Sequence, residues 1–98
     1  MRIHITNNRE PLLNLVEVYT RQLLVGKKVH IIINGSQIDG IVSSVELFED
    51  KERISLKAKT NENEIAIPLT DDTKITFGKE ELIIFETKNH STVIELLQ

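Results

Sequence analysis

A two-residue turn between two apolar strands, in residues 28–48, constrains the fold of this chain more than any other feature. Residues 29–34 are predicted to form a strand that runs directly into Asn34-Gly35, a pair that tolerates positive φ and favours a tight hairpin turn. The next predicted strand, residues 38–47, contains Gly40, where the missing side chain permits a bend. The sequence therefore predicts the start of a small, strongly bent β-sheet.

The segment before this hairpin is predicted to be a helix over residues 9–26. Pro11 suits the first turn because it loses no intrahelical hydrogen bond there, and Gly26 suits a left-handed C-terminal cap. Apolar residues recur at helical spacing, which predicts one buried stripe along the helix. The stripe consists of Leu12, Val16, Tyr19 and Leu23, widened by Leu13, Leu15, Leu24 and Val25.

The rest of the chain is typical of short strands at close spacing. Residues 53–59 and 65–69 alternate apolar and polar side chains, and Pro68 indicates an edge or a strand end. The predicted organisation is one domain over residues 1–98, since domains typically have about 100–150 residues. Its parts are a leading strand (1–8), the helix (9–26), a barrel core (27–77) and a C-terminal hairpin (78–98). We expect a mainly-β fold with one N-terminal α-helix: a small, strongly bent β-barrel plus a C-terminal β-hairpin.

Composition narrows the classes of function. The net charge is −3, so the chain lacks the broad positive field of a nonspecific nucleic-acid binder. The absence of cysteine rules out disulfides and thiolate metal sites, and it favours an intracellular setting. No stretch resembles a signal peptide or approaches a membrane span, so we expect a cytoplasmic protein with no membrane partner.

No catalytic or metal-binding pattern stands out. The histidines His4, His30 and His90 lie in three separate segments without metal-ligand spacing. The acidic pairs Asp71-Asp72 and Glu80-Glu81 are typical of solvated turns. We therefore expect a protein that is not an enzyme and that uses no metal and no cofactor.

Three features leave alternatives open. Phe48, a lone aromatic residue at a strand end, is either a core plug or a platform for stacking on unpaired bases. Lys57 and Lys59 either face solvent or contact phosphates. Residues 82–85 (Leu-Ile-Ile-Phe) must fill both faces of one strand, so one face serves the core and the other needs a cover, from the helix or another subunit.

Three short motifs resemble the Sm-like proteins, Hfq in particular. Residues 10–14 (EPLLN) resemble the opening of the Hfq helix, and residues 33–40 (INGSQIDG) are similar to the first Sm motif. Residues 45–48 (VELF) fall where Hfq carries an apolar residue, an acid, a polar residue and phenylalanine. The resemblance covers about residues 9–77, and residues 64–69 (EIAIPL) lack the Lys-His pair of the second Sm motif. It implies a helix followed by a small Sm-like barrel, similar also to SH3-like barrels, that assembles into rings.

The resemblance also implies site residues. Phe48 matches an aromatic residue that stacks on RNA bases, while Arg9 and Asn14 belong to the helix start beside that RNA-binding rim. The alternative function is therefore an Hfq-like ring that binds single-stranded RNA through its helix face.

The acidic charge and the missing Lys-His pair favour a different function. In this preferred hypothesis the chain is a non-enzymatic, homo-oligomeric interaction and assembly module that binds protein partners, including its own copies. Its interface would include the apolar hairpin residues Ile83, Ile84 and Phe85.

Overall fold

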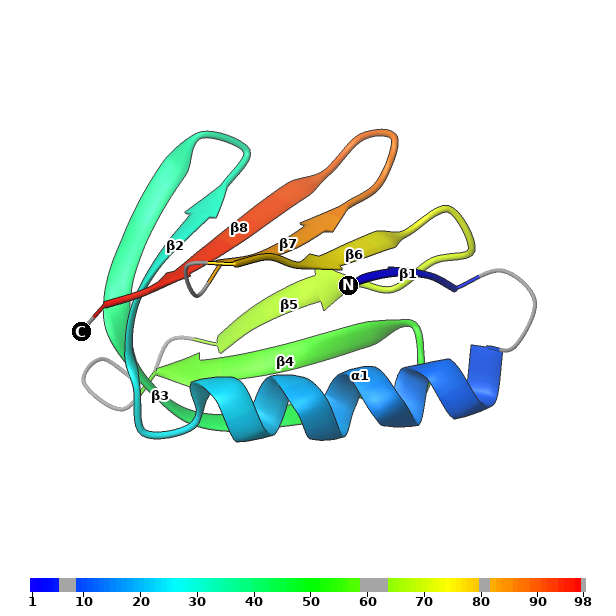
Figure 1. The fold of residues 1–98 in the computed structure, drawn as a ribbon, viewed down its shortest axis with the longest axis horizontal. Coiled ribbons are helices and arrows are strands. Elements are labelled where there is room, and N and C mark those ends of the chain that lie inside the picture. Colours follow the sequence, from blue (N-terminus) through cyan, green and yellow to red (C-terminus); the bar gives the residue numbers. More distant parts are fainter. Residues whose placement is uncertain (6–8, 59–63, 80–81, 98) are drawn as a thin grey trace.

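A computed structural model describes residues 1–5, 9–58, 64–79 and 82–97 (Figure 1). Within these ranges the chain forms eight strands and one helix near the N-terminus, which confirms the predicted mainly-β class. In chain order the elements are β1 (Arg2–His4), α1 (Arg9–Leu24), β2 (Lys28–Ile33), β3 (Ser36–Leu47), β4 (Arg53–Ala58), β5 (Glu64–Pro68), β6 (Lys74–Phe77), β7 (Leu82–Glu86) and β8 (Ser91–Leu96). Residues 6–8 of the predicted leading strand lie outside the described ranges.

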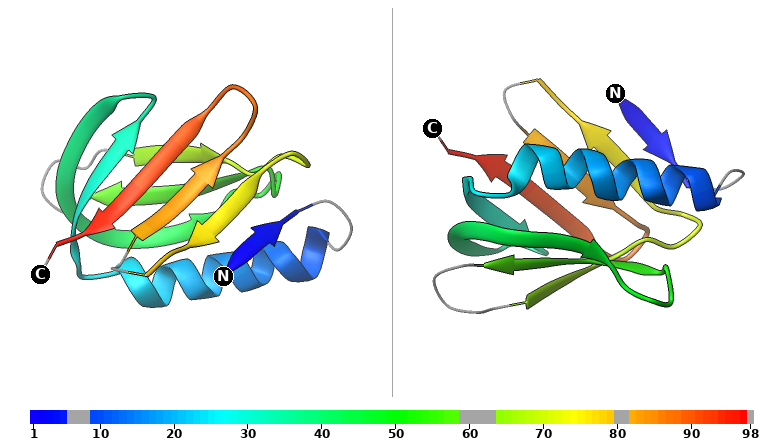
Figure 2. Two further views of the ribbon diagram at one scale, coloured as in Figure 1. Left: turned by 45° about the horizontal axis from the view of Figure 1, so that its top comes forward. Right: turned by 90° about the horizontal axis from the view of Figure 1, so that it is seen from below.

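The strands form one antiparallel sheet in the order β1-β6-β7-β8-β2-β3-β4-β5. The sheet is strongly curved, so that β3, β4 and β5 form a layer that faces the remaining strands (Figures 1 and 2). It is not closed: β1 and β5 are its two edges. Pro68, which has no N–H to donate, ends the edge strand β5, as the sequence predicted.

The curvature is concentrated in β3, which belongs to both layers. Residues 36–41 pair with β2, and residues 42–47 pair with β4. The register shifts between Val42 and Ser44, so the irregularity lies just after Gly40, the predicted bend. The preceding turn has φ of 46° at Asn34 and 90° at Gly35, and this confirms the predicted two-residue hairpin turn.

The C-terminal hairpin forms as predicted, but it lies in the middle of the sheet. β8 pairs with β7 on one side and with β2 on the other. The predicted barrel core of residues 27–77 therefore does not close on itself, because β6 pairs with β1 and β7 while β8 takes the free side of β2. Asn34 fixes this arrangement, since its backbone N–H donates to the carbonyl of Ser91 and its side-chain oxygen accepts from the Ser91 N–H, both at 3.0 Å.

Helix α1 spans the open side of the curved sheet and ends two residues before Gly26, whose φ is 82°. Seen from below, it lies between β3 and the side formed by β1 and β6 (Figure 2, right). The predicted buried stripe is wrong in its centre, because Tyr19 is 37% exposed whereas Thr20 is fully buried. The inner face of the helix is Leu13, Val16, Thr20 and Leu24.

The hydrophobic core lies between the two layers and under α1. It draws on alternate residues of the strands, because successive strand side chains point to opposite faces. Its largest fully buried side chains are Phe85, Ile5, Leu13, Leu24, Ile54, Leu56, Ile67, Leu69, Ile75, Ile83, Ile94 and Val16.

Candidate functional site

Helix α1 carries a second apolar surface on the side that faces away from the core. Leu15, Val18 and Val25 are 48%, 45% and 40% exposed, and Gln22 is exposed between them. Spacings of three and four residues align these side chains along one side of the helix and the residue that follows it. We call Leu15, Val18, Gln22 and Val25 the outer stripe. Large aliphatic side chains in such an arrangement are typical of a surface that another element covers.

Two charged residues of α1, Glu17 and Arg21, point sideways toward the edge of β3. Beyond residue 42, β3 is paired with β4 along one side only. On the other side Glu17 Oε2 accepts the N–H of Leu47 at 2.6 Å, and Arg21 Nε donates to the carbonyl of Val45 at 3.0 Å. These side chains satisfy backbone groups that a further strand would otherwise bind. Glu17 and Arg21 are therefore bonded to the sheet, and Leu15, Val18 and Val25 face outward.

A groove borders the outer stripe between α1 and strands β6, β7 and β8. It has a volume of about 440 Å³, and its lining includes Met1, Tyr19, Gln22, Lys27, Phe77 and Leu82. Tyr19 packs edge-on against Phe77, with 4.7 Å between the ring centroids. Because Gln22 belongs to both features, the stripe and the groove form one continuous surface.

Arg9, a predicted RNA-binding residue, is held by three acceptors within the chain. Its guanidinium lies 3.2 Å from the Asp71 carboxylate and donates to the carbonyls of Lys51 and Leu69, each at 2.7 Å. These contacts tie the start of α1 to the turn after β3 and to the segment after β5. Asn14 is exposed on α1. Arg9 thus has a structural task, and three of the five N–H donors of its guanidinium are engaged within the chain.

Phe48 is half-buried directly after β3, and a cation covers one face of its ring. The guanidinium carbon of Arg53 lies 4.2 Å from the ring centroid, and Arg53 also pairs with Asp50 at 2.9 Å. The N–H of Glu52 and then the Arg53 guanidinium hold the pKa of Asp50 below its usual range. A base that stacked on this side of Phe48 would have to displace Arg53.

The predicted hairpin interface is divided between the two faces of β7. Ile83 and Phe85 are each 1% exposed and belong to the core, whereas Ile84 points to the other face and is half-buried. Ile84 is paired across the sheet with Val93, and Val93 with Ile32, so a short apolar row crosses this outer face. Of the three predicted residues, only Ile84 is placed where a partner could reach it.

His30 lies on the same outer face and is bonded within a polar cluster. Its Nδ1 pairs with the Asp39 carboxylate, and the Gln37 amide donates to Asp39 at 2.9 Å. The Gln37 hydrogen bond, and then His30, keep the pKa of Asp39 below its usual range. His4 lies on β1 and His90 precedes β8, so the structure does not bring the three histidines together. Within the described ranges, no group of three or more His, Asp or Glu residues is arranged to hold a metal ion.

The acidic pair Asp71-Asp72 joins neighbouring turns. Asp71 pairs with Arg9, while Asp72 accepts hydrogen bonds from the Thr70 hydroxyl and, at 3.0 Å, from the backbone N–H of Lys88. Lys57 is exposed on β4. Glu80, Glu81 and Lys59 lie outside the described residues.

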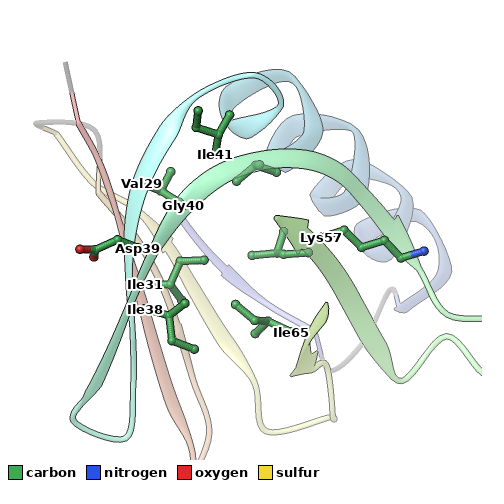
Figure 3. A pocket seen from close by; sticks show the side chains of 10 residues that line it. Val29, Ile31, Ile38, Asp39, Gly40, Ile41, Lys57 and Ile65 are labelled. Carbon is green, nitrogen blue, oxygen red and sulfur yellow. The ribbon is translucent and has the colours of Figure 1, made fainter. Parts of the chain in front are cut away.

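A small cavity lies inside the fold, between β2–β3 and β4–β5. Ile31, Ile38 and Ile65 converge on it, whereas Asp39 and Lys57 point away (Figure 3). Its volume of about 10 Å³ is room for about one water molecule. This cavity is a packing gap between aliphatic side chains, and it is too small for a substrate.

Sequence reasoning missed the outer stripe, because it assigned Leu15 and Val25 to a single widened core stripe. The signal that could have found it is the position of Glu17 and Arg21. Residues four apart lie on one side of a helix, so these two charges leave apolar side chains on more than half of its circumference. Such a helix has two apolar surfaces, and one core can cover only one of them.

Within the described part of the chain, the structure contains no helix with the length and hydropathy needed to cross a membrane. Comparison with protein-family models, with curated proteins and with solved structures finds no match to this chain.

Proposed function

We propose that this protein is a non-enzymatic interaction and assembly module that associates with its own copies through the outer stripe of α1. The observation that carries the proposal is the exposure of Leu15, Val18 and Val25 on one side of α1, while the neighbouring charges of Glu17 and Arg21 are bonded to β3. Covering such side chains removes apolar surface from water, which is the main driving force of protein association.

The adjoining groove supports the same proposal. Met1, at 61%, and Tyr19 are exposed large hydrophobic residues beside the stripe. Together with Leu15, Val18 and Val25 they make up all the large hydrophobic residues that are strongly exposed within the described ranges. Their concentration on one side of the molecule is typical of an interface.

The alternative, an RNA-binding ring, has less support from the predicted contact residues. The Arg9 guanidinium is engaged by Asp71 and by two carbonyls, and Arg53 lies over Phe48. An RNA base on the covered face of Phe48, or a phosphate on the engaged donors of Arg9, would have to replace these contacts, whereas a protein partner at the outer stripe leaves them intact.

The experiment is size-exclusion chromatography with light scattering over a range of protein concentrations, recorded at 260 and 280 nm. We expect the mass to rise above that of one chain with concentration, and Val18→Glu to abolish the rise. Asn89→Glu is the matched control, because it adds the same charge to an exposed position in the turn between β7 and β8, away from α1 (Figure 1).

A monomer at every concentration would overturn the proposal. An oligomer that tolerates Val18→Glu would move the interface away from α1. Nucleic acid that co-elutes with the protein would favour the RNA-binding alternative.

A further inference from the structure

We infer that the outer stripe pairs with the outer stripe of a second copy as two antiparallel helices, with Leu15 of one copy against Val25 of the other. The inference rests on the proposed function and names both the partner and its orientation. Seen from below, α1 lies in front of the strands along its whole length, so a second helix can approach it (Figure 2, right).

The spacing of the stripe fits a helix as the covering element. Leu15, Val18, Gln22 and Val25 follow one another at intervals of three, four and three residues. This alternation is the pattern by which two helices interlock their side chains along a common line.

A second copy is the simplest source of that helix, because the pattern is self-complementary. Two-fold symmetry places the same surface on both partners, so each contact is made twice. With maximal overlap of antiparallel stripes, Leu15 meets Val25 and Val18 meets Gln22, each pair occurring on both sides of the axis. Gln22 also lines the groove, where its amide can stay hydrated.

Electrostatics favours the antiparallel orientation over the parallel one. Arg9 and Glu10 at the start of α1 and Arg21 near its end are each paired within the chain, whereas Lys27 follows the helix and is exposed. A parallel pair would bring the two Lys27 ammonium groups and the like ends of the two helix dipoles together. An antiparallel pair separates these ammonium groups and aligns the helix dipoles favourably.

The size of the contact predicts a weak dimer. From Leu15 to Val25 the stripe is about 15 Å long, and helices pack at about 8–10 Å, so the footprint is a few hundred Å² at most. A stable complex typically buries about 800 Å² on each partner. The pair should therefore form in proportion to concentration, with Tyr19 and Met1 at the groove adding contact area.

Disulfide trapping tests the orientation, and the chain is suited to it because it contains no cysteine. Leu15→Cys and Val25→Cys are prepared separately, one of them with a tag that changes its mass, and are oxidised alone and as an equal mixture. In the antiparallel pair, identical positions lie about 15 Å apart, too far for a disulfide, which needs Cα atoms within about 7 Å.

We expect the mixed disulfide to exceed either homodimer about tenfold, because only the mixed pair meets the distance requirement. Glu95→Cys, at an exposed position on the outer face of the sheet, measures the background of disulfides that form by random collision. Circular dichroism of each variant should match that of the parent chain, because Leu15 and Val25 are exposed and lie outside the core.

Each other outcome overturns the inference in a distinguishable way. Disulfides within each single variant would show a parallel pair. Trapping at the level of Glu95→Cys, with a dimer still visible by light scattering, would show that another surface joins the copies, and the proposed function would survive. A monomer at all concentrations with no trapping would reject both.

Discussion

The two apolar sides of α1 have almost the same composition and opposite environments. On the inner side Leu13, Val16 and Leu24 are at most 1% exposed, while on the outer side Leu15 and Val18 are almost half exposed. The side chains themselves do not account for the difference. The curved sheet offers one concave surface to the helix, and it can cover only one side.

The polar residues of the helix explain why both sides are apolar. In an ordinary surface helix, charged side chains face water opposite the core. Here Glu17 and Arg21 lie between the two sides and bond to the unpaired edge of β3. The comparison teaches that a polar position on a helix can mark a neighbouring strand edge rather than solvent.

The largest expected effect is on folding, and it tests the same contrast between an inner and an outer face on strand β7. Ile83→Lys puts an amino group at a position that is 1% exposed, and burying it without a partner, charged or neutral, costs a large share of the typical domain stability of about 5–15 kcal/mol. Circular dichroism should show that Ile83→Lys is unfolded and that Ile84→Lys keeps the spectrum of the parent chain. Equal behaviour of the two variants would break the comparison.

A smaller effect tests the two sides of α1 directly. Leu13→Ala removes a fully buried side chain and should cost about 2–5 kcal/mol of unfolding free energy. Leu15→Ala, the same change on the outer side, should alter it by no more than about 0.5 kcal/mol. Urea denaturation at a concentration where the chain is monomeric measures both values. A similar loss for the two variants would mean that the outer stripe is covered within one chain.

The inner side contains one polar residue, and replacing it should sharpen the contrast. Thr20 is fully buried, and its hydroxyl has no hydrogen-bond partner among the described residues. Thr20→Val removes an unsatisfied group at constant shape and should raise the unfolding free energy by about 1 kcal/mol. Thr73→Val is the matched control: it should destabilise the chain, because the Thr73 hydroxyl accepts the N–H of Thr70 at 2.8 Å. Thermal denaturation of the two variants should give melting temperatures that shift in opposite directions.

The smallest effect is on the pH dependence of the melting temperature, and it arises from Asp72, outside α1. The inner and outer sides of α1 carry no acidic or basic side chains. The Thr70 hydroxyl, and then the Lys88 N–H, hold the pKa of Asp72 below its usual value of 3.8. A carboxylate with a lowered pKa in the folded state stabilises it above the unfolded pKa, and this contribution is lost as pH falls through the folded pKa. Melting temperatures should therefore fall below about pH 4 less steeply in Asp72→Asn than in the parent chain. The difference between Leu13→Ala and Leu15→Ala should persist throughout this pH range.

Local sequence signals predicted the helix, the strands and the turns, whereas the order of the strands in the sheet depends on long-range pairing. Asn34-Gly35 and Gly26 marked the turn and the helix end because their backbone conformations depend on the residue itself. The position of β8 beside β2 could not be predicted in this way, since it depends on which free strand edge meets Ser91 in three dimensions. The exposed apolar residues were predicted in part: Ile84 faces outward, whereas Leu15 and Val25 were assigned to the core stripe and are exposed. Periodicity counts apolar side chains but does not say how many of them one sheet can cover.

The central position of β8 has a consequence for how the chain is made. Strand β2 cannot pair with its second neighbour, β8, until residues 91–96 have emerged from the ribosome. In the same way, β1 cannot pair with β6 until residues 74–77 have been made. Until then β2 presents an open edge, the kind of exposed backbone that pairs with other nascent chains. Pairings this distant in sequence also slow folding, so we expect refolding within milliseconds to seconds. A chain shortened before residue 91 would lose the link between the two parts of its sheet.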